Sequence, residues 1–598
     1  MSIVPLAKVT LYGLVEEKAS VLGDLQAIGC LHLVPLRPAP DTGDLVGPSP
    51  QARNALKFLL ACPERRRQVH EPAKFDAADV ERRALEIQAR MQNLQNERDF
   101  LLRRIRDFEP WGEFTLPPLE DLANLRLWFY VVPHYRMKQL QATDLIWQVV
   151  HRDNRFYYVV IIAEQEPQGV PGERTHTGAK PRSELKRRLE EVEVELEDLQ
   201  VERGGLTRWL DLFARSVSHL EDKAALAYAS RQTHDADPLF ALQGWAPRAA
   251  LPRLDDYAQA NRLALVIEDP APEDKPPTLF HNPEPVAGGE DLVSFYMTPA
   301  YVDWDPSMVV FFSFSVFFAI ILSDAGYAAL LGLILAGLWR RMGQSSTGRR
   351  LRTLFTAMVA ASAAWGVLVG SYFGLEPPEG TLLAKAKVLD IRDFNTMMLI
   401  SILIGVVHVV VANGVKAWRG RGTTQAMAPL GWCIILIGGT SLWLGTQGVG
   451  GGVLDASGPW VMALGGLVIL LFTSDNPSLP RRLFGGLLGM TRLTNAFGDV
   501  LSYLRLFALG LASASLALAF NDLATQAGSV RGFGKLLAFL ILIVGHGMNF
   551  VLSIMSGVVH GLRLNMIEFF NWGLSEEGHP FRAFAKKEVT TWTPSSSP

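Results

Sequence analysis

The sequence predicts an α-helical membrane protein that carries a large polar domain before its membrane helices. The 598 residues divide near Pro306 into a part rich in charge and a mostly apolar part, which explains a mean hydropathy of only +0.16. Heptad repeats occur in the first part, and apolar runs separated by basic loops occur in the second. Together they predict eight transmembrane helices plus an N-terminal cytoplasmic α/β two-lobed domain bridged by an antiparallel coiled coil.

The bulk composition bounds the class of protein. A chain of 598 residues is too long for one hydrophobic core and should divide into domains. The formal net charge of −3 argues against a nucleic-acid partner. Cys30, Cys62 and Cys433 are scattered without metal-ligand spacing, so we expect a reducing compartment and neither a metal site nor a cofactor. The first residues lack the basic-then-apolar pattern of a signal peptide, so we expect the polar part to lie in the cytoplasm.

A proximal lobe is predicted from both ends of the polar part. Periodicity predicts a β-α-β start over Lys8–Gly13, Glu16–Ile28 and Leu31–Leu36. A strand, a helix and a second strand that complete this lobe are predicted over Leu239–Trp245, Leu251–Asn261 and Leu263–Glu268.

Two heptad repeats predict a coiled coil between these segments. Apolar residues recur at four-three spacing from Val80 to Phe108, and the same spacing returns from Leu185 to Ala224. Two such helices in one chain pair most simply as an antiparallel coiled coil, although two core helices of an ordinary bundle would carry the same pattern. The insert between them predicts a distal α/β lobe with strands at Leu125–Val132, Leu145–His151 and Phe156–Ile162.

Domain boundaries follow from these elements. The cytoplasmic arm is predicted at residues 1–290, with the proximal lobe at 1–75 and 225–290, the coiled coil at 76–110 and 182–224, and the distal lobe at 111–181. A membrane domain at 291–570 and a cytoplasmic tail at 571–598 complete the chain.

Charge parity gives the number of crossings. Met308–Trp339 is too long for one crossing, and the basic loop that follows it marks a cytoplasmic face, so this run should be a tight hairpin that turns near Ser323–Gly326. Leu483–Phe497 is predicted to be an interfacial amphipathic helix. The remaining crossings are predicted at Leu354–Leu375, Thr396–Val415, Met427–Thr446, Trp460–Thr473, Gly498–Asn521 and Leu536–Phe570, with both termini cytoplasmic. Two external loops run against the charge rule, through Lys385, Lys387, Arg392, Arg531 and Lys535.

The last apolar run carries polar residues in register. They follow one another at spacings of three and four, which places them on one face of a helix: His546, Asn549, Ser553, Ser556, His560 and Arg563. A buried arginine is costly in a membrane unless it meets a polar cavity or a partner. Arg563 could instead extend to the lipid headgroups, but the five further polar residues favour a functional face. Glu568 either lines an inner access path or pairs with a lysine.

A second arginine, Arg505, begins the preceding apolar run, after Asp499 and Ser502. Neither arginine has an acid three or four residues away. A guanidinium stays protonated and cannot carry a proton, but it lowers the pKa of a nearby carboxyl group and can expel its proton. Because no apolar run has a mid-helix acid that looks like the carrier, we expect the carrier carboxylate on another chain.

Three other polar residues within apolar runs have structural alternatives. Asp324 is either a hairpin-turn residue or an ion ligand, and His408 is either a packing histidine or part of an ion path. Tyr503 suits packing between helices.

Several segments together resemble a known family. The segments "GDVLSYLRLFALGLA" (498–512), "VVHGLRLNMIEFF" (558–570), "KPPTLFHNP" (275–283), "SDAGYA" (323–328) and the N-terminal "LAKVTLYGLVEEKASVLGDLQAIGCLHL" are similar to the membrane stator subunit of V-type/A-type rotary ATPases, called I in prokaryotes and a in eukaryotes. Eukaryotic members carry a carboxylate where Ser553 stands, and some relatives carry glutamine where His560 stands.

The resemblance implies a function and partners. The membrane part would face a rotating ring of proteolipid subunits with an essential carboxylate and give it two offset half-channels for H⁺ or Na⁺, with Arg505 and Arg563 as the barrier between them. The polar face from His546 to Ser556 would form a wall of the outer half-channel. The arm would bind peripheral stalk subunits at its lobes, near a central-stalk collar subunit. The expected location is the bilayer of a bacterial inner membrane, and the chain itself would not be catalytic.

Two other classes of protein are weighed against this interpretation. A secondary transporter could hold an anionic substrate between the two arginines, but no internal repeat with broken helices is visible. A pure membrane scaffold would leave both arginines unexplained.

Overall fold

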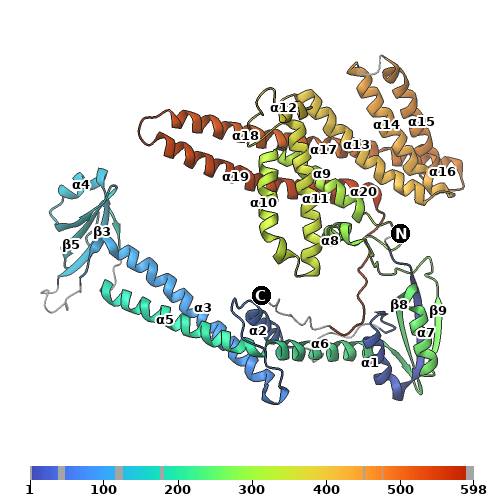
Figure 1. The fold of residues 1–598 in the computed structure, drawn as a ribbon, viewed down its shortest axis with the longest axis horizontal. Coiled ribbons are helices and arrows are strands. Elements are labelled where there is room, and N and C mark those ends of the chain that lie inside the picture. Colours follow the sequence, from blue (N-terminus) through green and yellow to red (C-terminus); the bar gives the residue numbers. More distant parts are fainter. Residues whose placement is uncertain are drawn as a thin grey trace. The chain divides into compact units, whose positions relative to one another are not determined.

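The computed structural model describes residues 3–37, 48–114, 125–175, 181–448, 452–474 and 476–587. The chain forms two compact units (Figure 1). The arm unit comprises Leu14–Gly29, Pro35–Phe240 and Phe584–Pro598, and the helical unit comprises Met1–Gly13, Cys30–Val34 and Ala241–Ala583. The sheet of the predicted proximal lobe thus groups with the membrane helices.

The arm unit is built on two long antiparallel helices, α3 (Ala77–Phe108) and α5 (Arg182–Leu206). Arg188 pairs with Glu97 at 2.8 Å and Arg182 with Glu109 at 3.6 Å, so residue numbers rise along one helix as they fall along the other. The predicted heptad positions form one buried cluster, which includes Val80, Ile87, Leu94, Val192, Leu199 and Phe213. The shorter helices of this unit are α1 (Lys18–Ile28), α2 (Pro50–Leu60) and α4 (Met137–Gln141).

The return helix is interrupted where the heptads predicted one continuous rod. α5 ends at Leu206, a 3₁₀ turn covers Thr207–Trp209, and α6 (Leu210–Gln232) follows. The pair Gly204–Gly205 weakens the helix at this point, and the Thr207 hydroxyl donates to the Gly204 carbonyl at 2.6 Å. Fully buried Thr207 also accepts a hydrogen bond from Arg66 N, which fixes the turn.

A four-stranded sheet lies at the end of the helical pair where α3 finishes and α5 starts. Its strand order is β4-β5-β3-β6, and every pair is antiparallel. The bounds are β3 (Arg126–Pro133), β4 (Ile146–Arg152), β5 (Phe156–Ala163) and β6 (Glu173–Arg174). The three predicted strands of the insert are therefore observed.

A second sheet has the order β2-β8-β1-β9, with short β7 (His234–Ala236) paired to β8. The bounds are β1 (Leu6–Leu14), β2 (His32–Val34), β8 (Leu239–Pro247) and β9 (Ala264–Glu268), with α7 (Leu251–Ala260) before β9. Gly244 of β8 is required because a Cβ there would lie 2.8 Å from the His32 carbonyl oxygen. The C-terminal segment joins this region, since Thr278 N donates to His579 O at 2.8 Å and Arg582 N to His32 Nδ1 at 2.9 Å.

The rest of the helical unit is a helical bundle. Six helical segments of the described chain are long and apolar enough to cross a membrane, whereas α9 has only 16 residues. The helices are α8 (Ala287–Tyr296), α9 (Ser307–Leu322), α10 (Ala325–Met342), α11 (Ser346–Val369), α12 (Leu382–Ala386), α13 (Phe394–Arg419), α14 (Met427–Thr446), α15 (Val453–Phe472), α16 (Leu479–Met490), α17 (Arg492–Ser502), α18 (Leu504–Gly528), α19 (Gly534–Arg563) and α20 (Phe570–Gly573).

The chain turns between α9 and α10 at the predicted residues, but both helices pack against α11 rather than closely against each other. Ser323 ends α9 in the left-handed region (φ 46°), and Asp324 caps α10 by accepting from Tyr327 N at 3.0 Å. Buried Asp324 also accepts from Phe373 N, Gly374 N and the Ser371 hydroxyl. These four bonds favour the interpretation of Asp324 as a turn residue over its interpretation as an ion ligand.

The crossing predicted at Gly498–Asn521 is interrupted by a break at Tyr503, between α17 and α18. The Tyr503 ring is fully buried and fits against Gly405 of α13, where a Cβ would lie 2.7 Å from the ring. Its hydroxyl lies 2.7 Å from His408 Nδ1. α18 then runs antiparallel to α19 as a long pair, drawn in orange-red and red in Figure 1.

Candidate functional site

Arg505 lies just after the break at Tyr503, in the first turn of α18. The buried Tyr503–His408 pair is continued by Phe569, whose ring stacks on His408 at 4.3 Å with an interplanar angle of 9°. This contact favours the packing role for His408. Arg505 is half-buried, and its Nη1 atom is buried without a hydrogen-bond partner among the described residues. Arg505 thus lies two residues after a buried aromatic cluster, and its hydrogen bonds within the described residues are incomplete.

Arg563 ends α19 and has an acidic partner that helical spacing did not reveal. A π-helical turn over Leu564–Phe569 follows it, and Arg563 Nε lies 3.9 Å from Glu568 Oε1. In a π-helix residues five apart come into register, whereas an α-helix brings together residues three and four apart. Glu568 is 3% exposed and its Oε2 atom has no partner among the described residues. Glu568 thus pairs with an arginine rather than with the lysine considered from the sequence.

The two arginines lie near His560 of α19 and Glu568 of the π-helical turn. Glu568 interacts electrostatically with both Arg505 and Arg563, and so does His560. The His560 Nδ1 atom is also buried without a hydrogen-bond partner in the described chain. Ser556, one turn earlier on α19, is half-buried. This arginine cluster, defined as Arg505, His560, Arg563 and Glu568, holds three buried polar atoms that could accept or donate further bonds.

The other half of the predicted polar face forms a hydrogen-bonded network between helices. Asn549 Nδ2 donates to Tyr327 OH at 3.0 Å and to Ser513 O at 2.9 Å. The hydroxyls of Ser513 and Ser553 are 2.7 Å apart. Asn549 and Ser553 are both buried, at 1% and 4% exposure. Half-buried His546 lies 2.8 Å from Tyr327 OH through Nδ1 and 3.0 Å from Asn521 Oδ1 through Nε2.

Asp499 lies on α17 at a polar recess of about 410 Å³ that is also lined by Arg492, Asn495, Asn571 and Trp572. Its Oδ2 atom accepts from Trp572 Nε1 at 2.8 Å, so the C-terminal helix fixes this carboxylate. Ser502 donates to the Gly498 carbonyl of its own helix at 3.1 Å and joins none of these groups.

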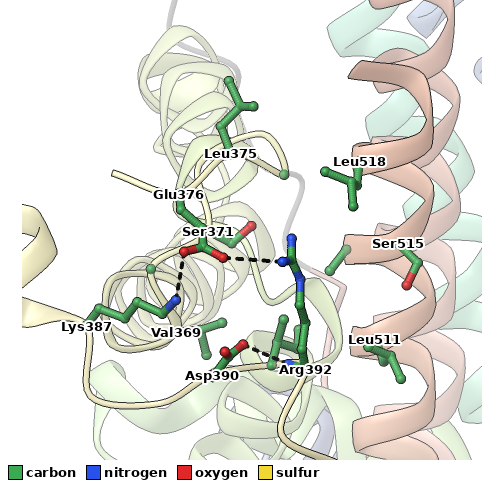
Figure 2. Close-up of a pocket in the computed structure, with 14 residues that line it drawn as sticks. Val369, Ser371, Leu375, Glu376, Lys387, Asp390, Arg392, Leu511, Ser515 and Leu518 are labelled. Carbon is green, nitrogen blue, oxygen red and sulfur yellow. Dashed lines mark hydrogen bonds and ion pairs between the residues drawn. The ribbon is translucent and has the colours of Figure 1, made fainter. Parts of the chain in front are cut away.

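A small pocket of about 50 Å³ lies where the chain between α11 and α13 meets α18 (Figure 2). Glu376 accepts from Lys387 at 3.0 Å and lies 3.7 Å from Arg392. Ser515 and Leu518 of α18 form the opposite wall. Two of the basic residues that ran against the charge rule are therefore partly neutralised by a neighbouring carboxylate.

Sequence reasoning missed several partners in these groups. Tyr327 was recognised only as part of a motif, and Asn521 and Trp572 were not considered. A polar residue inside an apolar helix is the signal that could have indicated Tyr327 and Asn521, because such groups need a partner in a membrane. Trp572 carries no comparable signal.

Comparisons with known proteins agree with the resemblance seen in the sequence. No protein-family model matches the chain. The V-type ATP synthase subunit I of Chlamydia pneumoniae is 26% identical over 596 aligned residues, which cover 85% of this chain and 86% of the relative. The A-type ATP synthase subunit I of Methanocaldococcus jannaschii is 27% identical over 67% of this chain and 64% of its own length. A solved structure of the cytoplasmic N-terminal domain of subunit I aligns with 44% of this chain and 99% of its own, at 17% identity and a TM-score of 0.22, which is too low to support a structural argument. The sequence relatives span both parts of the chain and are each named subunit I, so the chain is similar over most of its length to subunit I of V-type and A-type ATP synthases.

Proposed function

We propose that this membrane stator subunit conducts H⁺ or Na⁺ between two half-channels and that the arginine cluster is the barrier between them. The observation that carries the proposal is a polar cluster with incomplete hydrogen bonds, in which Arg563 pairs with the buried carboxylate of Glu568 and Arg505 interacts electrostatically with the same carboxylate. Arg505 Nη1, His560 Nδ1 and Glu568 Oε2 all lack partners in the described chain. Such atoms are costly inside a membrane unless water or another chain completes them.

The mechanism needs a carboxyl group from a partner, because the arginines themselves cannot release a proton. A carboxyl group on a rotating proteolipid ring is neutral while it faces lipid, since a bare charge there is prohibitively costly. Beside Arg505 the charged form is stabilised, and the group ionises and releases its ion. Fixed positive charge also repels cations that would otherwise leak straight from one half-channel to the other.

The access paths on the two sides use different groups. We assign the inner path to the recess that holds Asp499, with Ser502 between it and Arg505. For the outer path we retain His546, Ser556 and His560, which are half-buried. Asn549 and Ser553 would support this wall through their hydrogen bonds to Tyr327 and Ser513 rather than contact water.

We propose the wider assembly from the similarity to subunit I. The membrane part would cross eight times, with α9 and α10 as the first two crossings, and both termini would be cytoplasmic in a bacterial inner membrane. The arm at residues 1–290 would resist torque through peripheral stalk subunits at its lobes, next to a central-stalk collar subunit. The chain is a non-catalytic subunit, and the relatives give no support to a secondary transporter.

Substitution of Arg505 tests the barrier. In the assembled complex, Arg505→Ala should reduce ATP-driven ion uptake into vesicles to background while the subunits still co-purify. Arg505→Lys should fail as well, because a buried ammonium is a compact charge that can lose its proton. The matched control is Arg531→Ala, which removes an exposed arginine after α18 and should leave uptake unchanged. Substantial coupled uptake by Arg505→Ala would contradict the proposal, and comparison with and without Na⁺ identifies the ion.

A further inference from the structure

Two cavities lie one after the other along the same three helices of the membrane bundle. The first is a recess of about 510 Å³ whose lining includes Lys416 of α13, Trp432 of α14 and Arg492 of α17. The second is a groove of about 550 Å³ along the same α13, α14 and α17, lined almost entirely by apolar side chains. One end of the pair is cationic and polar, and the rest is apolar.

The recess suits an anion. Lys416 is half-buried and Arg492 is exposed, and neither has an ion-pair or hydrogen-bond partner in the part of the chain that the structure describes. No carboxylate lines this recess. Asp499 lies in the adjoining recess, where Trp572 donates to it. Trp432 and Trp572 stack edge to face at 5.1 Å, and tryptophan prefers the headgroup level of a bilayer.

The length of the groove matches that of an acyl chain. It is lined on α13 from Met398 to Val406 and on α17 from Leu493 to Leu501. Eight helical steps cover ~12 Å, close to the ~15 Å that one leaflet contributes to a hydrocarbon core. On α14, Gly439 leaves the groove open, because a Cβ there would meet only the Met462 sulfur, at 3.9 Å.

We propose that the recess and groove together bind one anionic phospholipid, with its phosphate between Lys416 and Arg492 and an acyl chain in the groove. The site lies outside the arginine cluster and shares Arg492 and Trp572 with the recess that holds Asp499. It would couple the packing of α13, α14 and α17 to the presence of acidic lipid.

Native mass spectrometry of the detergent-solubilised full chain, incubated with equimolar phosphatidylglycerol and phosphatidylcholine, tests this site. The wild type should retain one phosphatidylglycerol molecule in preference to phosphatidylcholine. The double variant Lys416→Gln/Arg492→Gln should lose about 25-fold of that preference, roughly five-fold for each cation. Gly439→Phe should prevent retention of either lipid by filling the groove.

Two variants serve as controls. Arg481→Gln removes an exposed arginine outside the recess, and Gly337→Phe adds the same ring to an exposed position where a Cβ meets nothing within 4 Å. Both should bind like the wild type. Equal retention of the two lipids by the wild type, or unchanged preference in the double variant, would overturn the proposal. Binding of glycerol phosphate that Gly439→Phe leaves intact would also overturn it, because it would indicate a site for a free anion. A protein helix found in the groove would overturn it as well.

Discussion

At the scale of single residues, the ion pair of the arginine cluster depends on a carboxylate that is almost fully buried. The side chain of Glu568 is 3% exposed and that of Arg563 is 51% exposed, so the buried carboxylate holds the half-exposed arginine in position. We expect Glu568→Gln to reduce ATP-coupled ion uptake by up to about five-fold, the change that corresponds to ~1 kcal/mol, because Arg563 loses its partner. Uptake by vesicles containing the assembled complex is the measurement.

The control for this variant is Glu290→Gln, which neutralises a carboxylate paired with Arg350 at 3.5 Å elsewhere in the same unit. Normal uptake by Glu568→Gln would show that Arg563 needs no carboxylate partner.

Thiol labelling distinguishes the wet residues of α19 from those bonded to neighbouring helices. With Cys30, Cys62 and Cys433 replaced by alanine, Ser556→Cys and His560→Cys should react with small polar thiol reagents. Asn549→Cys and Ser553→Cys should be protected, because both positions are buried. Rapid labelling of Ser553→Cys would contradict the interhelical network.

The residue scale also shows where sequence reasoning ended. Helical spacing placed the polar residues of α19 on one face, which needs only the period of the helix. It could not supply Tyr327, whose hydroxyl reaches Asn549 from a position 222 residues away. It also missed the Arg563–Glu568 pair, because a local π-turn changes which positions meet.

At the scale of elements, the two long helices of the arm should depend on their buried seam. Val192 is fully buried, whereas Val194, two positions on, is 58% exposed. Val192→Asp should destabilise the pairing of α3 and α5 by several kcal/mol, because it places an unpaired charge in an apolar core. Val194→Asp is the matched control and should change stability by less than ~0.5 kcal/mol. Hydrogen exchange of the α3 and α5 amides in the full chain measures both, and similar protection in the two variants would contradict the seam.

Periodic elements were the predictable ones. The heptads located α3 and most of α5, and alternation located β3, β4 and β5, because each pattern reports a face that must be buried. The interruptions at Thr207 and Tyr503 were not predictable from periodicity. At each interruption a buried side chain is held by a distant partner, Arg66 in the first case and His408 in the second.

At the scale of the whole molecule, sequence reasoning separated a polar from an apolar part but not the grouping of the sheet with the membrane helices. That grouping depends on long-range contacts, such as the hydrogen bond from Leu6 N to the Tyr301 hydroxyl at 2.8 Å. The number of membrane crossings was also not fixed by the sequence. Charge parity requires two crossings between Met308 and Trp339, but α9, the first of them, has only 16 residues, fewer than the ~20 that a crossing usually needs.

The last such contact closes the C-terminal segment onto β2 and should respond to pH. Arg582 N donates to His32 Nδ1 at 2.9 Å, so this bond needs the neutral ring. Burial lowers the pKa of His32 below its ordinary 6.5, and the nearby His579 and Arg582 lower it further. A histidine whose folded pKa lies below its unfolded value contributes fully above pH ~6.5, and that contribution is lost as the pH falls through the folded pKa.

We therefore expect hydrogen exchange at residues 576–582, corrected for intrinsic rates, to be slow at pH 7.5 and several-fold faster near pH 5. His32→Gln keeps an acceptor without a titrating group, so its exchange should depend much less on pH. If His32→Gln shows the same acid-induced loosening as the wild type, then the segment is released by another group, and the bond to His32 is not its pH-sensitive contact.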